Sequence, residues 1–216
     1  MDAPAFAEDV VSLAEALGFD HYGVLGHSWG AFVALQNAVD FPEAVSLSII
    51  SGGLPSSRYL EKTFEAIAAF EPVELREQVA DSWEREKDVQ TEEEMGEVLR
   101  DQMPFHFRNP RDPRINDMMQ RLAGARYAPE VAGFFSANED YGALDLEHRL
   151  TEVTHPVLVL SGRHQRTCVV EGAEALAAGI PDSQLVILEN SAHMCYVEEN
   201  EAYCGAIRGF VAAHGS

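Results

Sequence analysis

A serine between two glycines is the residue whose surroundings most clearly suggest chemistry. Residues 26–30 read Gly-His-Ser-Trp-Gly, which has the form Gly-x-Ser-x-Gly. The apolar stretch at 21–25 before the motif reads as a strand, and residues 31–38 after it have helical composition. A serine on a sharp strand-to-helix turn has an exposed hydroxyl, and the turn requires small residues on both sides, here the two glycines. The motif predicts Ser28 as a nucleophile.

The two residues that flank Ser28 also have expected functions. Trp29 follows the serine, and its backbone N–H can point at an oxyanion that develops on a carbonyl under attack. His27 precedes the serine, and we expect it to take part in substrate binding.

A histidine far downstream is the expected partner of Ser28. His193 follows residues 184–188, an apolar run that reads as a buried strand. A side chain just past the carboxyl end of such a strand faces the crevice in which α/β proteins bind ligands. Of the eight histidines, His193 alone has the right strand, chain order and distance from Ser28. We predict it as general base and then general acid.

The third position of the expected triad holds an amide. The acid of this arrangement comes between serine and histidine, after the strand predicted at 156–160, where Gln165 stands. The other acid position, after the strand at 45–50, offers Ser-Gly-Gly and no acid. Glutamine can orient an imidazole but cannot stabilise imidazolium, and the corresponding Asp→Asn exchange in a serine protease lowers turnover about 10⁴-fold. We expect a comparable loss unless Glu171 or Asp140 substitutes.

Together these motifs resemble the α/β-hydrolase fold and, within it, the proline iminopeptidase-like group. The resemblance covers residues 5–213 and includes the Gly-Arg-His-x-Arg-Thr segment at 162–167 and the Glu-Asn-Ser-Ala-His-Met segment at 189–194. It implies a serine hydrolase that removes the N-terminal residue of a short peptide, with no metal or organic cofactor. A carboxylic-ester or lactone hydrolase on the same scaffold is the first alternative. A pseudoenzyme or non-catalytic fragment that binds small molecules is the second.

The resemblance also suggests residues for substrate recognition. Gln165 sits where the family has aspartate. In relatives, a glutamate after a Gly-Pro-Asn-like turn binds the free amino group of the substrate, and Glu139 follows a similar Ser-Ala-Asn turn. Glu84 is a second candidate. Some relatives have a further glutamate directly after the catalytic aspartate, where this chain has Arg166.

The order of predicted elements gives an α/β fold with a doubly wound, mostly parallel sheet. Residues 1–53 and 148–216 alternate strands and helices and form the hydrolase core. Residues 54–147 break that alternation with acidic helical stretches and prolines, which predicts a helical cap above the serine.

The beginning of the chain departs from the family. Four strands precede the elbow strand in relatives and need roughly 70 residues, whereas only residues 1–20 precede it here. We therefore expect the first strands to be missing, together with the loop that supplies a second oxyanion N–H, and Met1 to be an internal methionine of a longer protein. The elbow strand would then be an open sheet edge that invites a homo-oligomer.

Composition excludes several classes of partner. The net charge is −21 with 15 basic residues, which argues against nucleic acid and anionic membranes as partners. No apolar run is long enough to span a membrane, and acidic residues interrupt any signal peptide at 1–20, so we expect a cytoplasmic protein. The three cysteines have neither a disulfide framework nor the spacing of a zinc site.

Overall fold

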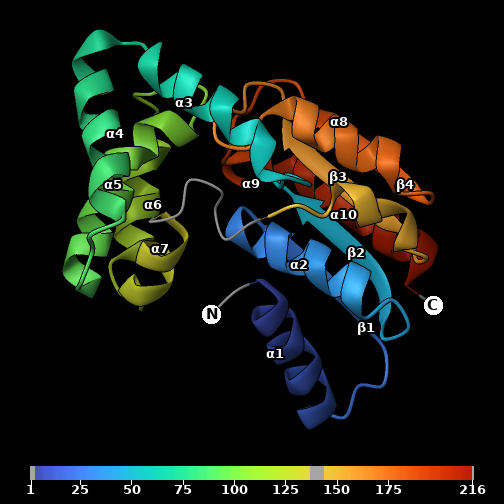
Figure 1. The fold of residues 1–216 in the computed structure, drawn as a ribbon. Coiled ribbons are helices and arrows are strands. Elements are labelled where there is room, and N and C mark those ends of the chain that lie inside the picture. The colour runs from blue at the N-terminus through green and yellow to red at the C-terminus, as the bar shows by residue number, and fades with distance from the viewer. Residues whose placement is uncertain (1–2, 137–143, 216) are drawn as a thin grey trace.

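A four-stranded parallel sheet organises the protein. The computed structural model describes residues 3–136 and 144–215. The strands are β1 (Tyr22–His27), β2 (Val45–Ser51), β3 (Val157–Gly162) and β4 (Ser183–Leu188), and they lie in the order β1-β2-β3-β4 (Figure 1). Helices separate them along the chain, as parallel strands require. The prediction of a doubly wound α/β fold is confirmed.

Ten α-helices and two 3₁₀ turns lie within the described residues. Their bounds are α1 (Ala3–Ala16), α2 (Trp29–Asp40), η1 (Ser57–Tyr59), α3 (Leu60–Ala68), α4 (Val73–Glu86), α5 (Glu92–His106), α6 (Arg114–Leu122), α7 (Pro129–Ser136), η2 (Glu147–Glu152), α8 (Val170–Gly179), α9 (Cys195–Glu198) and α10 (Asn200–His214).

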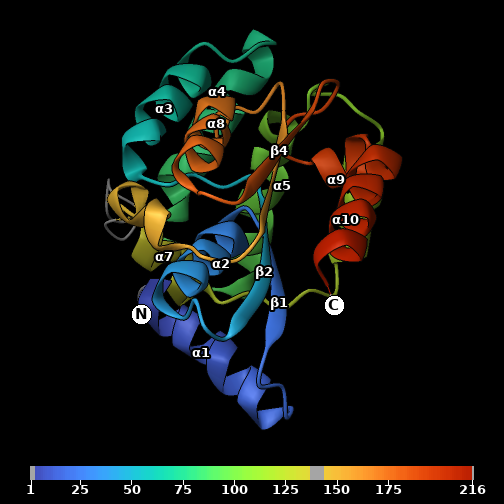
Figure 2. The same ribbon diagram turned by 90° about the vertical axis from the view of Figure 1, so that its right-hand side faces the viewer.

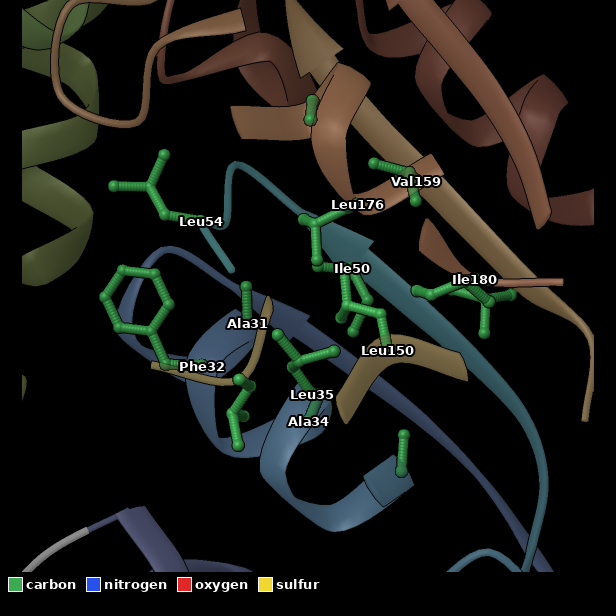
Figure 3. Close-up of a cluster of buried hydrophobic side chains, with 14 of the residues drawn as sticks. Ala31, Phe32, Ala34, Leu35, Ile50, Leu54, Leu150, Val159, Leu176 and Ile180 are labelled. Carbon is green, nitrogen blue, oxygen red and sulfur yellow. The ribbon is translucent and has the colours of Figure 1, made fainter. Parts of the chain in front are cut away.

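Helices cover both faces of the sheet. In Figure 2, α2 and α8 lie on one side of the strands and α9 and α10 on the other. Alternate residues of β2 divide between the two sides, since Ile50 packs with α2 and α8 whereas Leu47 and Ile49 pack with α10. Figure 3 shows the first of these clusters, in which Leu35 of α2 and Leu176 of α8 meet over Ile50. The resulting core fixes the carboxyl ends of the strands.

The β1 edge of the sheet is incompletely covered. No described strand pairs with its outer side, and Leu25 within it is 50% exposed. Helix α1 packs against α2, with Phe6 edge-on to Trp29 at 6.0 Å between ring centroids. Leu13 of α1 and Leu17, which directly follows the helix, are 62% and 63% exposed. The expected open edge of the sheet is therefore present, and these two leucines are uncovered.

Five helices, α3 to α7, lie between β2 and β3 in the chain; we call residues 60–136 the helical insertion. Figure 1 shows it as a separate group beside the sheet. It has apolar clusters of its own, one of them built on Phe70, Val79 and Phe105. Its helices therefore fold around local contacts, and α5 also contacts the loop between β4 and α9, since Met103 packs with Met194.

Candidate active site

The turn between β1 and α2 holds Ser28 in a strained conformation. Its φ is +57°, and it is the one non-glycine residue with positive φ in the described chain. Such a backbone costs about 1–2 kcal/mol for an L-residue. A Cβ on Gly26 would lie 1.9 Å from the carbonyl oxygen of Gly30, whereas one on Gly30 would meet nothing within 4 Å. Of the two positions expected to need a small residue, only Gly26 faces backbone that a Cβ would strike, whereas Gly30 leaves room for one.

Backbone contacts fix the same turn from the sheet side. The N–H of Ser28 donates to the carbonyl of Ser51 at the end of β2, at 2.9 Å. Helix α2 begins at the next residue, Trp29, so the positive end of its dipole lies beside the serine. The Trp29 ring also packs edge-on against Phe32. This arrangement suits a developing negative charge near Ser28.

His193 and Gln165 form a buried pair. The imidazole Nδ1 lies 2.9 Å from Oε1 of Gln165, and the two residues are 2% and 8% exposed. Because an amide oxygen only accepts, Nδ1 carries the proton and Nε2 of His193 keeps its lone pair. Nε2 of Gln165 has no partner among the described residues. Gly52, at φ +58°, lies against the pair, since a Cβ there would be 3.0 Å from that nitrogen.

Two further histidines surround the pair and keep it neutral. The rings of His27 and His106 lie 4.8 and 5.0 Å from that of His193, centroid to centroid. Burial lowers the pKa of His27 and of His106 to about 4. Burial, and then these two neighbours, hold the pKa of His193 well below its usual value. Nδ1 of His27 is bound to Ser51 Oγ at 3.0 Å, while its Nε2 has no partner in the described chain.

The proposed substitute acids do not reach His193. Glu171 is paired with Lys62. Asp140 lies outside the described residues. Within the described part of the chain, no hydrogen bond or ion pair joins His193 to a carboxylate. The imidazole is therefore oriented by a neutral amide, which supplies no charge to stabilise its protonated form.

A cavity of about 510 Å³ lies between the sheet and the helical insertion. Ser28 and His193 line it together with His27, Trp29 and Thr167. No hydrogen bond joins Ser28 Oγ to His193 in this ligand-free arrangement of the described residues, a bond that in many hydrolases tightens only with substrate. The remaining walls are mainly apolar and come from α1, α2, α5 and α7: Phe6, Phe32, Met95, Leu99, Met103, Val131 and Ala132.

Among the described residues, one carboxyl group lines this cavity, and it comes from α4. Glu86 lines it and accepts a hydrogen bond from the buried Gln102 side chain. Burial raises the pKa of the Glu86 carboxyl group. Glu84, the residue expected from the sequence, is exposed, paired with Lys87 and absent from the cavity wall. Glu139 lies outside the described residues.

Sequence reasoning missed Glu86 because it is one of many carboxylates in a charged stretch, with Arg85 and Lys87 on either side. The available signal was its spacing from Trp83, since residues three apart share a helix face and both line the cavity. His106 was missed as well, and its signal was a histidine between the two buried phenylalanines 105 and 107. For both residues, the helix face on which the side chain lies decides whether it reaches the site, and the residue type alone does not show this.

Other reactive groups near the site are inert or unclustered. Cys168 lines the cavity, but burial raises its pKa to about 12, so it stays a thiol. All three cysteines are free. The described residues contain no group of three or more His, Cys, Asp or Glu side chains placed to hold a metal ion.

None of the described helices is both long and apolar enough to cross a bilayer.

Comparison with known families agrees with this geometry. The model of the alpha/beta hydrolase fold family matches residues 1–200. The chain belongs to this family. A proline iminopeptidase of Clostridium botulinum is 28% identical over 207 residues, which are 94% of this chain and 70% of the relative. One from Heyndrickxia coagulans is 26% identical, over 95% of this chain and 72% of the relative.

Solved structures share the fold. An alpha/beta fold family hydrolase from Bacillus anthracis superposes with a TM-score of 0.77 at 20% identity, covering 97% of this chain and 74% of its own. The proline iminopeptidase of Mycobacterium smegmatis gives 0.69 at 22% identity, covering 98% and 72%. A thermophilic esterase from Thermogutta terrifontis gives 0.73 at 22% identity, covering all of this chain and 74% of its own. The fold is thus shared with solved structures of both a peptidase and an esterase.

Proposed function

We propose that this protein is a serine hydrolase that transfers an acyl group to water through Ser28. The observation that carries the proposal is the left-handed Ser28 at the end of β1, in the same cavity wall as the buried base His193. A strained backbone persists only where the surrounding structure over-determines it, and such strain clusters at functional sites.

The reaction follows from the atoms available. Ser28 Oγ attacks the substrate carbonyl while Nε2 of His193 takes its proton. The start of α2, with the Trp29 N–H, faces the oxyanion of the tetrahedral intermediate. Collapse breaks the bond to the leaving group, which takes the proton from His193. Water then attacks the acyl-serine through the same base, releasing the acid and restoring Ser28.

For the substrate, we propose an N-terminal residue with a free amino group, as the proline iminopeptidase relatives suggest. Glu86 supports this choice because burial raises its pKa and no described cation is paired with it. An ammonium group of the substrate would supply the missing positive charge and favour the ionised carboxylate. Glu139 remains a second candidate for the same contact.

The apolar cavity walls favour a second candidate, an ester hydrolase. Met95, Met103 and Met194 line the cavity, and methionine adapts to ligands of different shape. Such walls suit the acyl chain of a neutral ester, which would leave Glu86 without a charged partner.

Hydrolysis of proline p-nitroanilide and p-nitrophenyl acetate tests both candidates. Ser28→Ala should abolish turnover of both substrates. If Glu86 binds the amino group, Glu86→Gln should raise KM for the anilide at least about tenfold and leave the ester unchanged, since a lost charged hydrogen bond costs about 1.5–3 kcal/mol. Glu84→Gln, on the same helix but outside the cavity, is the matched control.

The outcomes separate the candidates. Turnover of the ester alone, unaffected by Glu86→Gln, would replace the aminopeptidase with the esterase. Turnover that survives Ser28→Ala would overturn the serine mechanism. A folded wild-type protein that hydrolyses neither substrate and does not react with a fluorophosphonate would indicate the non-catalytic alternative.

A further inference from the structure

The loop that carries His193 is attached to the end of α5 on both sides of the histidine. On one side, the N–H of Met194 donates to the carbonyl of His106 at 3.2 Å. On the other, Glu198 accepts from the N–H of Ala192 at 2.7 Å and, through its other oxygen, from the N–H of Arg108 at 2.9 Å. The helical insertion therefore holds the backbone on either side of the base.

The same end of α5 contacts the imidazole itself. The His106 ring lies 5.0 Å from that of His193, with 39° between the ring planes, and His106 is only 7% exposed. Its Nδ1 has no hydrogen-bond partner among the described residues. The ring thus packs against His193 as a neutral body and gives it no charge.

Arg166, which follows Gln165, fixes the end of α5 in turn. Its Nη1 donates to the carbonyls of Phe105 and Phe107, at 3.0 and 2.8 Å, and Nη2 donates to that of Arg108 at 3.3 Å. Its guanidinium also stacks over the rings of Phe70 and Phe105, at 5.2 and 5.9 Å from their centroids. A forked cation is suited to bind several carbonyls at the end of a helix at once.

In the serine-protease triad, the aspartate both orients the histidine and stabilises its charge. Here the amide of Gln165 makes one neutral hydrogen bond, which is weaker than the charge-assisted bond of a carboxylate. A ring held by that bond alone is weakly oriented. The contacts from α5 act on the same ring and on its neighbouring backbone.

We propose that Arg166 and His106 are positioning residues for His193, so that the end of α5 orients the base that Gln165 holds only weakly. The proposal rests on the proposed function of Ser28 and His193. It also assigns Arg166 a purpose other than contact with substrate, since its side chain binds backbone carbonyls and is absent from the cavity wall.

The test compares Arg166→Met with Arg163→Met. Methionine keeps an apolar stem over Phe70 and Phe105 but removes the donors. Arg163 lies on the same loop, exposed and paired with Glu189, and serves as the control. Arg166→Met should lower kcat with p-nitrophenyl acetate about 10- to 100-fold with little change in KM, because small displacements of a catalytic group carry costs of this size. His106→Ala should lower the rate. His106→Phe, which keeps an aromatic ring at this position, should retain most of it.

A second readout does not depend on turnover. The Nδ1–H proton of His193 should give a slowly exchanging NMR signal in the wild type and in Arg163→Met, and a broadened or absent one in Arg166→Met. An unchanged signal and unchanged kcat in folded Arg166→Met would overturn the proposal. A protein without turnover but with the expected NMR difference would overturn the proposed function alone.

Discussion

The two regions on either side of His193, the Ser28 turn and the Gln165 amide, differ in how fully they match an expected catalytic triad. Toward the cavity, the Ser28 turn has the strained backbone expected of a nucleophile elbow, with φ at +57° and the start of α2 beside it. On the far side, a neutral amide stands where the sequence resemblance predicts a carboxylate, with a nitrogen that has no described partner. The shape of the nucleophile is set by local backbone sterics, whereas the strength of the base depends on a charge brought by another strand. The shape of the serine turn can therefore persist in a chain that lacks the charge beside the base.

The largest effect should come from disrupting the turn that holds Ser28. Gly26→Ala places a Cβ 1.9 Å from the carbonyl oxygen of Gly30, so the turn cannot form as it stands. We expect a loss of at least about 3 kcal/mol in the free energy of unfolding, measured by urea denaturation, and no labelling of Ser28 by a fluorophosphonate. Gly30→Ala is the matched control and should be tolerated. Equal stability of both variants would contradict the account of the elbow.

The next largest effect should come from supplying the missing negative charge at residue 165. Gln165→Glu has the same shape as the wild type and adds a negative charge to the acceptor of His193 Nδ1–H. We expect p-nitrophenyl acetate turnover to rise about 10²-fold or more. The acid limb of its pH profile should move upward, because a carboxylate raises the pKa of the imidazole.

Gln165→Asp, one methylene shorter, controls for reach and should gain less than Gln165→Glu. If neither variant gains, the charge at this position does not limit the rate. The orientation of the ring by α5 or the oxyanion contacts would then be the limiting factor.

A smaller effect concerns stability at acid pH. The pKa values of His27 and His106, near 4, and of His193, also lowered, lie below the value of about 6.5 in an unfolded chain. Between about pH 6.5 and 4 the unfolded state binds protons that the folded state does not. The histidine contribution to the free energy of unfolding should therefore fall as pH falls through this range, by up to about 1.4 kcal/mol per pH unit for each histidine.

Urea denaturation across that range measures this slope, which reports the number of protons taken up on unfolding. His106→Phe should lower that number by about one. A slope that is the same in wild type and variant would show that His106 is not held neutral by the fold. Gln165→Glu should reduce the slope as well, because a carboxylate partner restores the pKa of His193.

The smallest effect lies on the outer side of the elbow strand. The free edge of β1, with exposed Leu25 and the uncovered Leu13 and Leu17, should support weak association of two copies. Sedimentation should show a concentration-dependent dimer that Leu25→Glu weakens, whereas Ser28→Ala at the inner end leaves it intact. A strictly monomeric wild type would refute association through this edge.

Local sequence determined the elements and the order of the site. The strand-turn-helix pattern around Ser28, the strands before Gln165 and His193, and the alternation that gives a parallel sheet all follow from residues close together in the chain. Sterics and hydrophobic periodicity act over such short distances, so the pattern alone specified the fold class and placed the serine, the amide and the histidine each after the end of a strand, namely β1, β3 and β4.

Only the tertiary structure decided which side chains meet at the site. Glu86 rather than Glu84 enters the cavity because α4 presents one face to it, and that face depends on how α4 packs. Arg166 binds carbonyls at the end of α5 because a half-buried cation near a helix end finds its acceptors there. An added Cβ would meet nothing at Gly30 but would strike the Gly30 carbonyl from Gly26, since the clash involves backbone that crosses the turn. Orientation of a helix face depends on long-range packing, which the residue types of a single segment do not encode.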